Sequence, residues 1–150
     1  MQLFWKKKEA KSISIADFIF EKNKDNLDAV ALLWVSKDGE EKNYSYRDLD
    51  IMSNKAANML KDFGINKKDR VFLYLDRSPE TFFFTLGILK LGAVYCPLFP
   101  SFGRDAVMER FTDCKGSLII AENHSVENIS DLPHILVDRD GDFMEKLLSR

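Results

Sequence analysis

The sequence predicts an α/β fold, in which a Rossmann-like parallel sheet is flanked by helices and preceded by a β-hairpin. The main observation is the stretch from Arg70 to Pro100, where a strand-like run, a helix-like segment and a second strand-like run form a βαβ pattern. The second observation is Asp38-Gly39 between two earlier strand-like runs, which is a hairpin signal. We expect residues 1–12 to form an N-terminal arm and residues 13–150 to form a single α/β domain, because 150 residues are a usual domain size.

The first elements are a short helix and the hairpin. We expect the helix over Ile15–Lys22, with Ser14 as its N-cap. Its buried face would carry the apolar side chains of Ile15, Phe18, Ile19 and Phe20. Residues 29–35 are an apolar strand, and residues 42–44 are the returning strand.

The next helix begins at Ser45 and ends before Gly64. Asp48 stands three residues after Ser45, as in a capping box. An apolar stripe at helical spacing consists of Leu49, Met52, Ala56, Met59, Leu60 and Phe63. We interpret this stripe as the face that packs on the sheet, rather than as an adaptable methionine-rich binding surface.

The βαβ unit itself has clear boundaries. Val71–Leu75 is apolar throughout, as expected of a strand buried on both faces. Ser78 is the expected N-cap of the following helix and Pro79 its first residue, while Gly92 suits the left-handed conformation that ends a helix. Val94–Cys96 then reads as a second buried strand.

The remaining segments alternate between loops, helices and strands. We expect an irregular loop at residues 99–103, a helix at 104–114 and a strand at 117–121. We then expect a polar loop at 122–133, a short strand at 134–138 and the start of a helix at 142–148. The helix would turn four side chains inward: Ala106, Val107, Arg110 and Phe111.

Composition excludes several classes of function. The formal net charge is −2 with scattered basic residues, which argues against nucleic-acid binding. No apolar run approaches the roughly 20 residues that span a bilayer, and the charges near Met1 follow the apolar residues, which is the wrong order for a secretory signal. We therefore expect a cytoplasmic protein with no membrane partner. The two cysteines and two histidines are not clustered, so no metal ligand is assigned.

Catalytic motifs are missing as well. The sequence has no G-x-G-x-x-G, no G-x-x-x-x-G-K-[ST] and no G-x-S-x-G. Asp76 and Arg77 follow the central strand, where a site could form, but Ser78 and Pro79 explain this stretch as a helix entry. We assign no catalytic residue.

Four blocks carry a family resemblance: Tyr44–Leu49, Asp69–Phe72, Arg77–Glu80 and Leu89–Phe99. In this order they resemble the N-terminal part of the adenylate-forming (AMP-binding) ligases. Within that family, the residues from Pro97 to Val107 are most similar to bacterial acetyl-CoA synthetases. The resemblance covers roughly residues 12–138.

The resemblance implies that the chain is the first subdomain of an adenylate-forming ligase. The parent enzyme would join ATP and a short-chain carboxylate into an acyl-adenylate and transfer the acyl group to CoA. ATP, Mg²⁺ and CoA are implied for that parent, and the remainder of the ligase chain is the implied partner. The family's phosphate loop and catalytic lysine lie downstream of the matched blocks, so we expect this fragment alone to hold no cofactor and to be inactive.

One stretch matches a binding element of the family. Phe99, Pro100, Ser101 and Phe102 correspond to the wall that receives the nucleotide end of CoA in acetyl-CoA synthetases. An aromatic face can stack on adenine, and loops after strand ends are where α/β ligands bind. Some relatives have glycines at the positions of Pro100 and Ser101. Some relatives also have a basic residue after the strand that contains Ile119 and Ile120, and this chain has no obvious counterpart of it. The alternative is that the two phenylalanines fill the seam to the rest of the ligase.

Two other functions stay open. The chain could be a stand-alone truncated binding or interaction module with no ligase activity. It could also be a fragment of an adenylation enzyme that loads a carrier protein.

Overall fold

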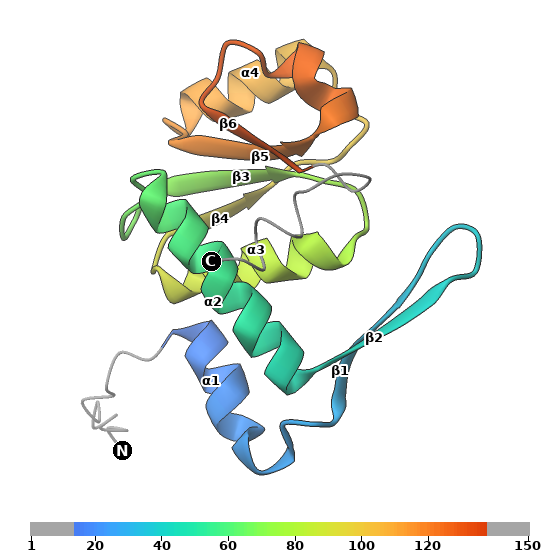
Figure 1. Ribbon diagram of the computed structural model, residues 1–150. Helices are drawn as coiled ribbons and strands as arrows, with labels where there is room; N and C mark the ends of the chain where they lie inside the picture. The colour runs from blue at the N-terminus through green and yellow to red at the C-terminus, as the bar shows by residue number, and fades with distance from the viewer. Residues whose placement is uncertain (1–13, 138–150) are drawn as a thin grey trace, which may run out of the picture.

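The computed structural model describes residues 14–137 (Figure 1). In chain order the elements are α1 (Ile15–Lys22), η1 (Lys24–Asn26), β1 (Val30–Val35), β2 (Glu41–Ser45), α2 (Tyr46–Asp62), β3 (Arg70–Tyr74), α3 (Pro79–Lys90), β4 (Val94–Pro97), α4 (Arg104–Asp113), β5 (Leu118–Glu122), η2 (Asn123–Asn128) and β6 (His134–Val137). The expected arm (1–12) and helix start (142–148) lie outside the described residues.

The strands form two sheets, and their arrangement confirms the predicted fold class. Strands β4, β3, β5 and β6 lie in that order and are parallel throughout. Strands β1 and β2 form a separate antiparallel hairpin, whose turn places Gly39 at a φ of +84°. A positive φ is the conformation for which glycine is suited, which explains the Asp-Gly signal.

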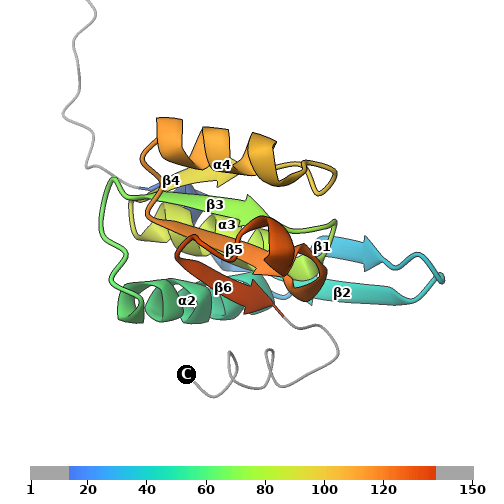
Figure 2. The same ribbon diagram turned by 90° about the horizontal axis from the view of Figure 1, so that it is seen from above.

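The central strand β3 is buried on both faces, as predicted. Val71, Leu73 and Leu75 pack in the core cluster that contains residues of α2 and α3. Phe72 and Tyr74 point to the other face, where they pack with residues of α4. Figure 2 shows α4 on one side of the sheet and α2 and α3 on the other. A three-layer arrangement of this kind explains why the strand is apolar from Val71 to Tyr74.

The predicted strand at Val94–Cys96 is confirmed as β4, but the prediction that it is buried is wrong, because β4 lies at the edge of the sheet. Among residues 14–137 only β3 pairs with β4, and Val94 is 44% exposed. Pro97 ends the strand, and proline is tolerated at a sheet edge because it has no N–H to donate. The apolar run alone does not distinguish an edge strand from a central one.

Helix α2 confirms the predicted capping box. The Ser45 Oγ accepts a hydrogen bond from the Asp48 backbone N–H at 3.1 Å, and the Asp48 carboxylate accepts from the Ser45 N–H at 2.8 Å. The Ser45 hydroxyl also donates to the Asp48 carboxylate at 2.6 Å, and this bond, together with the one from the Ser45 N–H, lowers the pKa of Asp48. Gly64 has a φ of +84° just after the helix. Phe63 is an error of prediction, because it lies at the C-cap and is 53% exposed.

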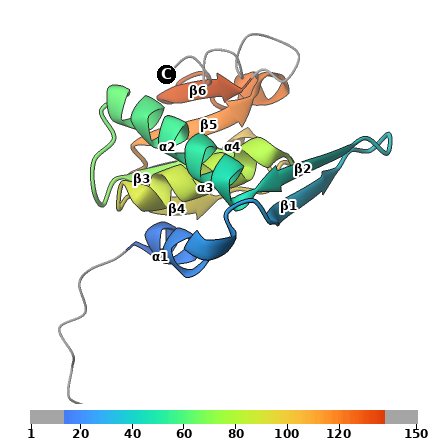
Figure 3. The ribbon, with the colours of Figure 1, turned by 60° about the horizontal axis from the view of Figure 1, so that its bottom comes forward.

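Two other expected burials are also corrected. Ile15 and Phe18 are 67% and 54% exposed, and Ala16 is the buried residue of α1. Helix α1 packs against α3 (Figure 3), and the exposed side chains are on its uncovered side. Arg110 of α4 is exposed too, with its guanidinium 4.5 Å from the ring centre of Phe102.

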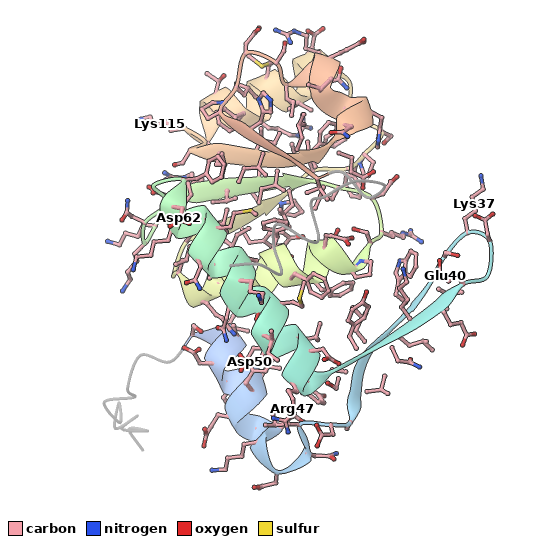
Figure 4. All side chains as sticks on the ribbon, viewed as in Figure 1. Lys37, Glu40, Arg47, Asp50, Asp62 and Lys115 are labelled. Carbon is pink, nitrogen blue, oxygen red and sulfur yellow. The ribbon has the colours of Figure 1, made fainter. Side chains whose placement is uncertain are left out.

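Lys90 joins the three helices on one side of the sheet. Its Nζ donates to the Asp50 carboxylate at 2.5 Å and to the Asn54 side-chain oxygen at 2.7 Å, both on α2 (Asp50 is labelled in Figure 4). It also lies 4.5 Å from the ring centre of Phe20 on α1. Several partners stabilise the charged amino group of Lys90, which allows this side chain to be half-buried between the helices.

Among the helices between residues 14 and 137, none combines the length and the apolarity needed to cross a membrane.

Candidate functional site

The residues of the candidate site lie at or just after the carboxyl ends of three parallel strands. Asp76 follows β3, Phe99 to Gly103 follow β4, and Glu122 ends β5. Parallel strands bring these positions to one edge of the sheet, which is where open α/β sheets bind their ligands. Figure 2 shows the β3 and β5 arrowheads on the side toward which the β1–β2 hairpin projects.

The predicted loop after β4 is a tight turn. The Phe102 backbone N–H donates to the Phe99 carbonyl at 2.9 Å, so Pro100 and Ser101 form its exposed corner. The rings of Phe99 and Phe102 meet edge to face, with centroids 5.5 Å apart. The four predicted site residues therefore lie together in one turn.

The two phenylalanines differ in exposure. Phe99 is 70% exposed, whereas Phe102 is half-buried and packs against the α4 side of the core. The Arg110 guanidinium covers the Phe102 ring. The turn thus presents one aromatic face to solvent and holds a fixed positive charge beside it, an arrangement that suits a planar, anionic ligand.

Tyr74 anchors this turn to the central strand. The ring is 2% exposed, and its hydroxyl donates to the Phe102 carbonyl oxygen. The same hydroxyl accepts from the Asn128 side-chain amide at 3.2 Å. In the sequence, Tyr74 stands out only as one residue of the apolar run Val71–Leu75. The signal was available, because a buried tyrosine hydroxyl requires a hydrogen-bond partner.

A second cluster lies at the ends of β3 and β5 and was also missed. Glu122 is 7% exposed, and its Oε1 accepts from the Asp76 backbone N–H at 3.0 Å. Its Oε2 lies 3.4 Å from His124 Nδ1. One potential ligand atom from each of Asp76, Glu122 and His124 lies within 4.8 Å of the others. The available signal was that adjacent strands both end near acidic residues.

The start of α3 differs from its prediction. Ser78 holds the N-cap position, but its hydroxyl makes no cap bond and is buried without a partner among residues 14–137. One carboxylate oxygen of Glu80 is also buried and has no hydrogen-bond partner among these residues. The carbonyl of Arg77 accepts from Trp34 Nε1 at 2.9 Å, so the hairpin is fixed to this helix entry.

Cys96 does not resemble an activated nucleophile. Cys96 is half-buried, and this burial raises the pKa of its thiol. A raised pKa keeps the sulfur protonated at neutral pH, whereas nucleophilic cysteines need the thiolate. Cys114 is exposed at the end of α4.

Comparison with known proteins identifies relatives of this chain. The sequence model of the family described as AMP-binding enzyme matches residues 19–148. The acetyl-coenzyme A synthetase of Bacillus subtilis is 36% identical over 119 residues, which cover 77% of this chain and 20% of that protein. The 3-hydroxypropionyl-coenzyme A synthetase of Sulfurisphaera tokodaii is 37% identical over 90 residues, which cover 60% and 14% of the two proteins.

The fold has a solved relative too. The crystal structure of an acyl-CoA synthetase from Brucella canis matches with a TM-score of 0.79 and 28% sequence identity, covering 91% of this chain and 27% of that one. The chain thus spans about a fifth or less of the length of the two curated relatives above.

Proposed function

Because the chain belongs to the AMP-binding enzyme family, we propose that it forms the N-terminal part of an acyl-CoA ligase for a short-chain carboxylate such as acetate. The observation that carries this proposal is the 36% identity to an acetyl-coenzyme A synthetase over 77% of the chain. The parent enzyme activates the carboxylate with ATP and Mg²⁺ and then transfers the acyl group to CoA. The partner of the chain is the remainder of the ligase, and the compartment is the cytoplasm.

Within this ligase, the turn Phe99–Phe102 receives the nucleotide end of CoA. The exposed ring of Phe99 supports this role because it can stack on adenine, and Arg110 beside Phe102 supplies positive charge. Pro100 and Ser101 replace the glycines of some relatives, so the ligand contacts the aromatic side chains rather than the backbone.

The residues for activation come from elsewhere in the ligase. The seven glycines of the sequence are spread singly, so they supply no loop of backbone N–H groups to hold phosphates. We therefore place no ATP-binding residue within residues 14–137. The purified 150-residue chain then has no ligase activity, and pyrophosphate release from ATP that depends on acetate would contradict this.

An interaction module is the second candidate, and exposed apolar side chains favour it. They include Leu33 and Val35 on β1 and Phe82 on α3, which are 55%, 52% and 47% exposed. Apolar surface of this kind often marks an interface. Sedimentation of the pure chain separates the candidates, because a stable monomer with no dye-binding hydrophobic surface would count against an autonomous module.

A further inference from the structure

We propose that Asp76, Glu122 and His124 bind one divalent transition-metal ion, such as Zn²⁺ or Mn²⁺. The proposal does not depend on the ligase assignment, because it rests on the geometry of these three side chains. Two carboxylates and one imidazole form a mixed oxygen and nitrogen ligand set, which suits such ions.

The ligand spacing supports a single ion. Zn²⁺ bonds to imidazole nitrogen and carboxylate oxygen are about 2.1 Å long, so two ligands of a tetrahedral ion lie about 3.4 Å apart. The distance from His124 Nδ1 to Glu122 Oε2 is 3.4 Å. One carboxylate oxygen of Asp76 lies within 4.8 Å of one potential ligand atom of Glu122 and one of His124, so side-chain rotation can bring the three residues around one ion.

The scaffold fixes the central ligand. Glu122 ends β5 and is buried, and the Asp76 backbone N–H holds its Oε1 at 3.0 Å. A hydrogen bond of this kind orients a metal-binding carboxylate, as outer-shell partners do in known metal sites. The other carboxylate oxygen, Oε2, is the one that lies beside His124.

Charge and access also favour a cation. Glu122 and Asp76 place two carboxylates close together at one edge of the sheet, and within residues 14–137 the Asp76 carboxylate has no ion pair or hydrogen bond. A divalent ion would offset the negative charge of the Asp76 carboxylate. Asp76 and His124 are exposed, which leaves a path for the ion and coordination positions for water or an anionic ligand.

The test is a titration of the 150-residue chain, free of any histidine tag, with MnCl₂ and ZnCl₂ by calorimetry. The Zn²⁺ titration uses the Cys114→Ser background, because an exposed thiol also binds zinc. We expect one equivalent to bind. His124→Ala and Asp76→Asn should each weaken binding about tenfold or more. Both residues are exposed, so the variants should keep the circular dichroism spectrum of the parent.

The control is His134→Asn. Its ring nitrogen Nδ1 lies 2.8 Å from the Leu132 carbonyl oxygen, outside the metal-binding cluster. This variant should bind with unchanged affinity. Paramagnetic Mn²⁺ should also broaden the amide resonances of Asp76, Glu122 and His124 before others. The absence of binding, equal affinity in the Asp76 and His124 variants, or broadening centred elsewhere would each overturn the proposal.

Discussion

The hydroxyl of Tyr74 donates a hydrogen bond to the carbonyl oxygen of Phe102, 28 residues further along the chain. The bond joins the end of the central strand to the turn that follows the edge strand. It therefore fixes the position of the exposed Phe99 ring, which contacts Phe102 edge to face. The Tyr74 hydroxyl thus ties the candidate ligand surface to the central strand of the sheet.

Tyr74→Phe should lower the free energy of unfolding by about 1–3 kcal/mol. The substitution removes the donor to Phe102 and leaves the Asn128 amide without its acceptor. Urea unfolding measures the loss. Tyr95→Phe is the matched control, since Tyr95 is also in the parallel sheet but its hydroxyl makes no hydrogen bond with residues 14–137. An equal loss in both variants would show that the Tyr74 hydroxyl has no special role.

Phe99→Ala should leave the stability of the chain nearly unchanged, because the ring is 70% exposed. If the turn receives the nucleotide end of CoA, the same substitution should weaken CoA binding about five- to 150-fold, the equivalent of about 1–3 kcal/mol for a lost base–aromatic stack. Phe82→Ala, on α3 and 47% exposed, is the control. Calorimetry with CoA measures both variants, each made in the complete ligase that contains this chain. Unchanged affinity in Phe99→Ala would remove the ring from the proposed site.

Gly87→Ala should destabilise the chain by about 1–3 kcal/mol, although alanine favours helices over glycine. An added Cβ would lie 2.9 Å from the Ala57 backbone nitrogen and 3.1 Å from the Ser53 carbonyl oxygen, so α2 and α3 would have to separate. Gly103→Ala is the control, because no atom lies within 4 Å of its added Cβ. Thermal unfolding compares the two. A neutral Gly87→Ala would show that the helix contact is loose.

The Asp48 carboxylate should contribute to stability in a pH-dependent way. Its hydrogen bonds from Ser45 lower its pKa in the folded chain below the usual 3.8. The contribution is therefore complete above the unfolded-state pKa and is lost as the pH falls through the folded-state pKa. When urea unfolding is followed from neutral pH to about pH 2, the free energy of unfolding should fall less steeply at acid pH in Asp48→Asn than in the parent chain. Asp25→Asn, at an exposed site in η1, should show the same acid-dependent fall as the parent chain. An unchanged pH dependence of the unfolding free energy in Asp48→Asn would contradict this contribution of the Asp48 carboxylate.

The sequence was sufficient wherever neighbouring residues determine the structure. The capping box of Ser45 and Asp48 and the hairpin turn at Gly39 each depend on contacts within a few residues, and the structure confirms them. The βαβ unit was predictable too, because apolar runs and helix boundary residues alternate along the chain.

The sequence was insufficient wherever distant elements decide burial. Within the part of the chain that the structure describes, Val94 is exposed because no strand pairs with the outer edge of β4, and Phe18 is exposed because α1 is covered on one side only. The contact between Glu122 and Asp76 joins residues 46 positions apart, which no local pattern encodes. The four residues Phe99–Phe102 were proposed from the family resemblance of one contiguous block, whereas Tyr74 and Glu122 reach the edge of the sheet from other strands.

The central claim is that this chain is the N-terminal part of a larger acyl-CoA ligase. The most direct test is to isolate the native polypeptide from its source cells with an antibody raised against the chain. Its mass is then measured, and the isolate is assayed for acetyl-CoA formed from acetate, ATP and CoA. The account predicts a polypeptide several times larger than 17.3 kDa that carries this activity. A polypeptide of 17.3 kDa without the activity would contradict it.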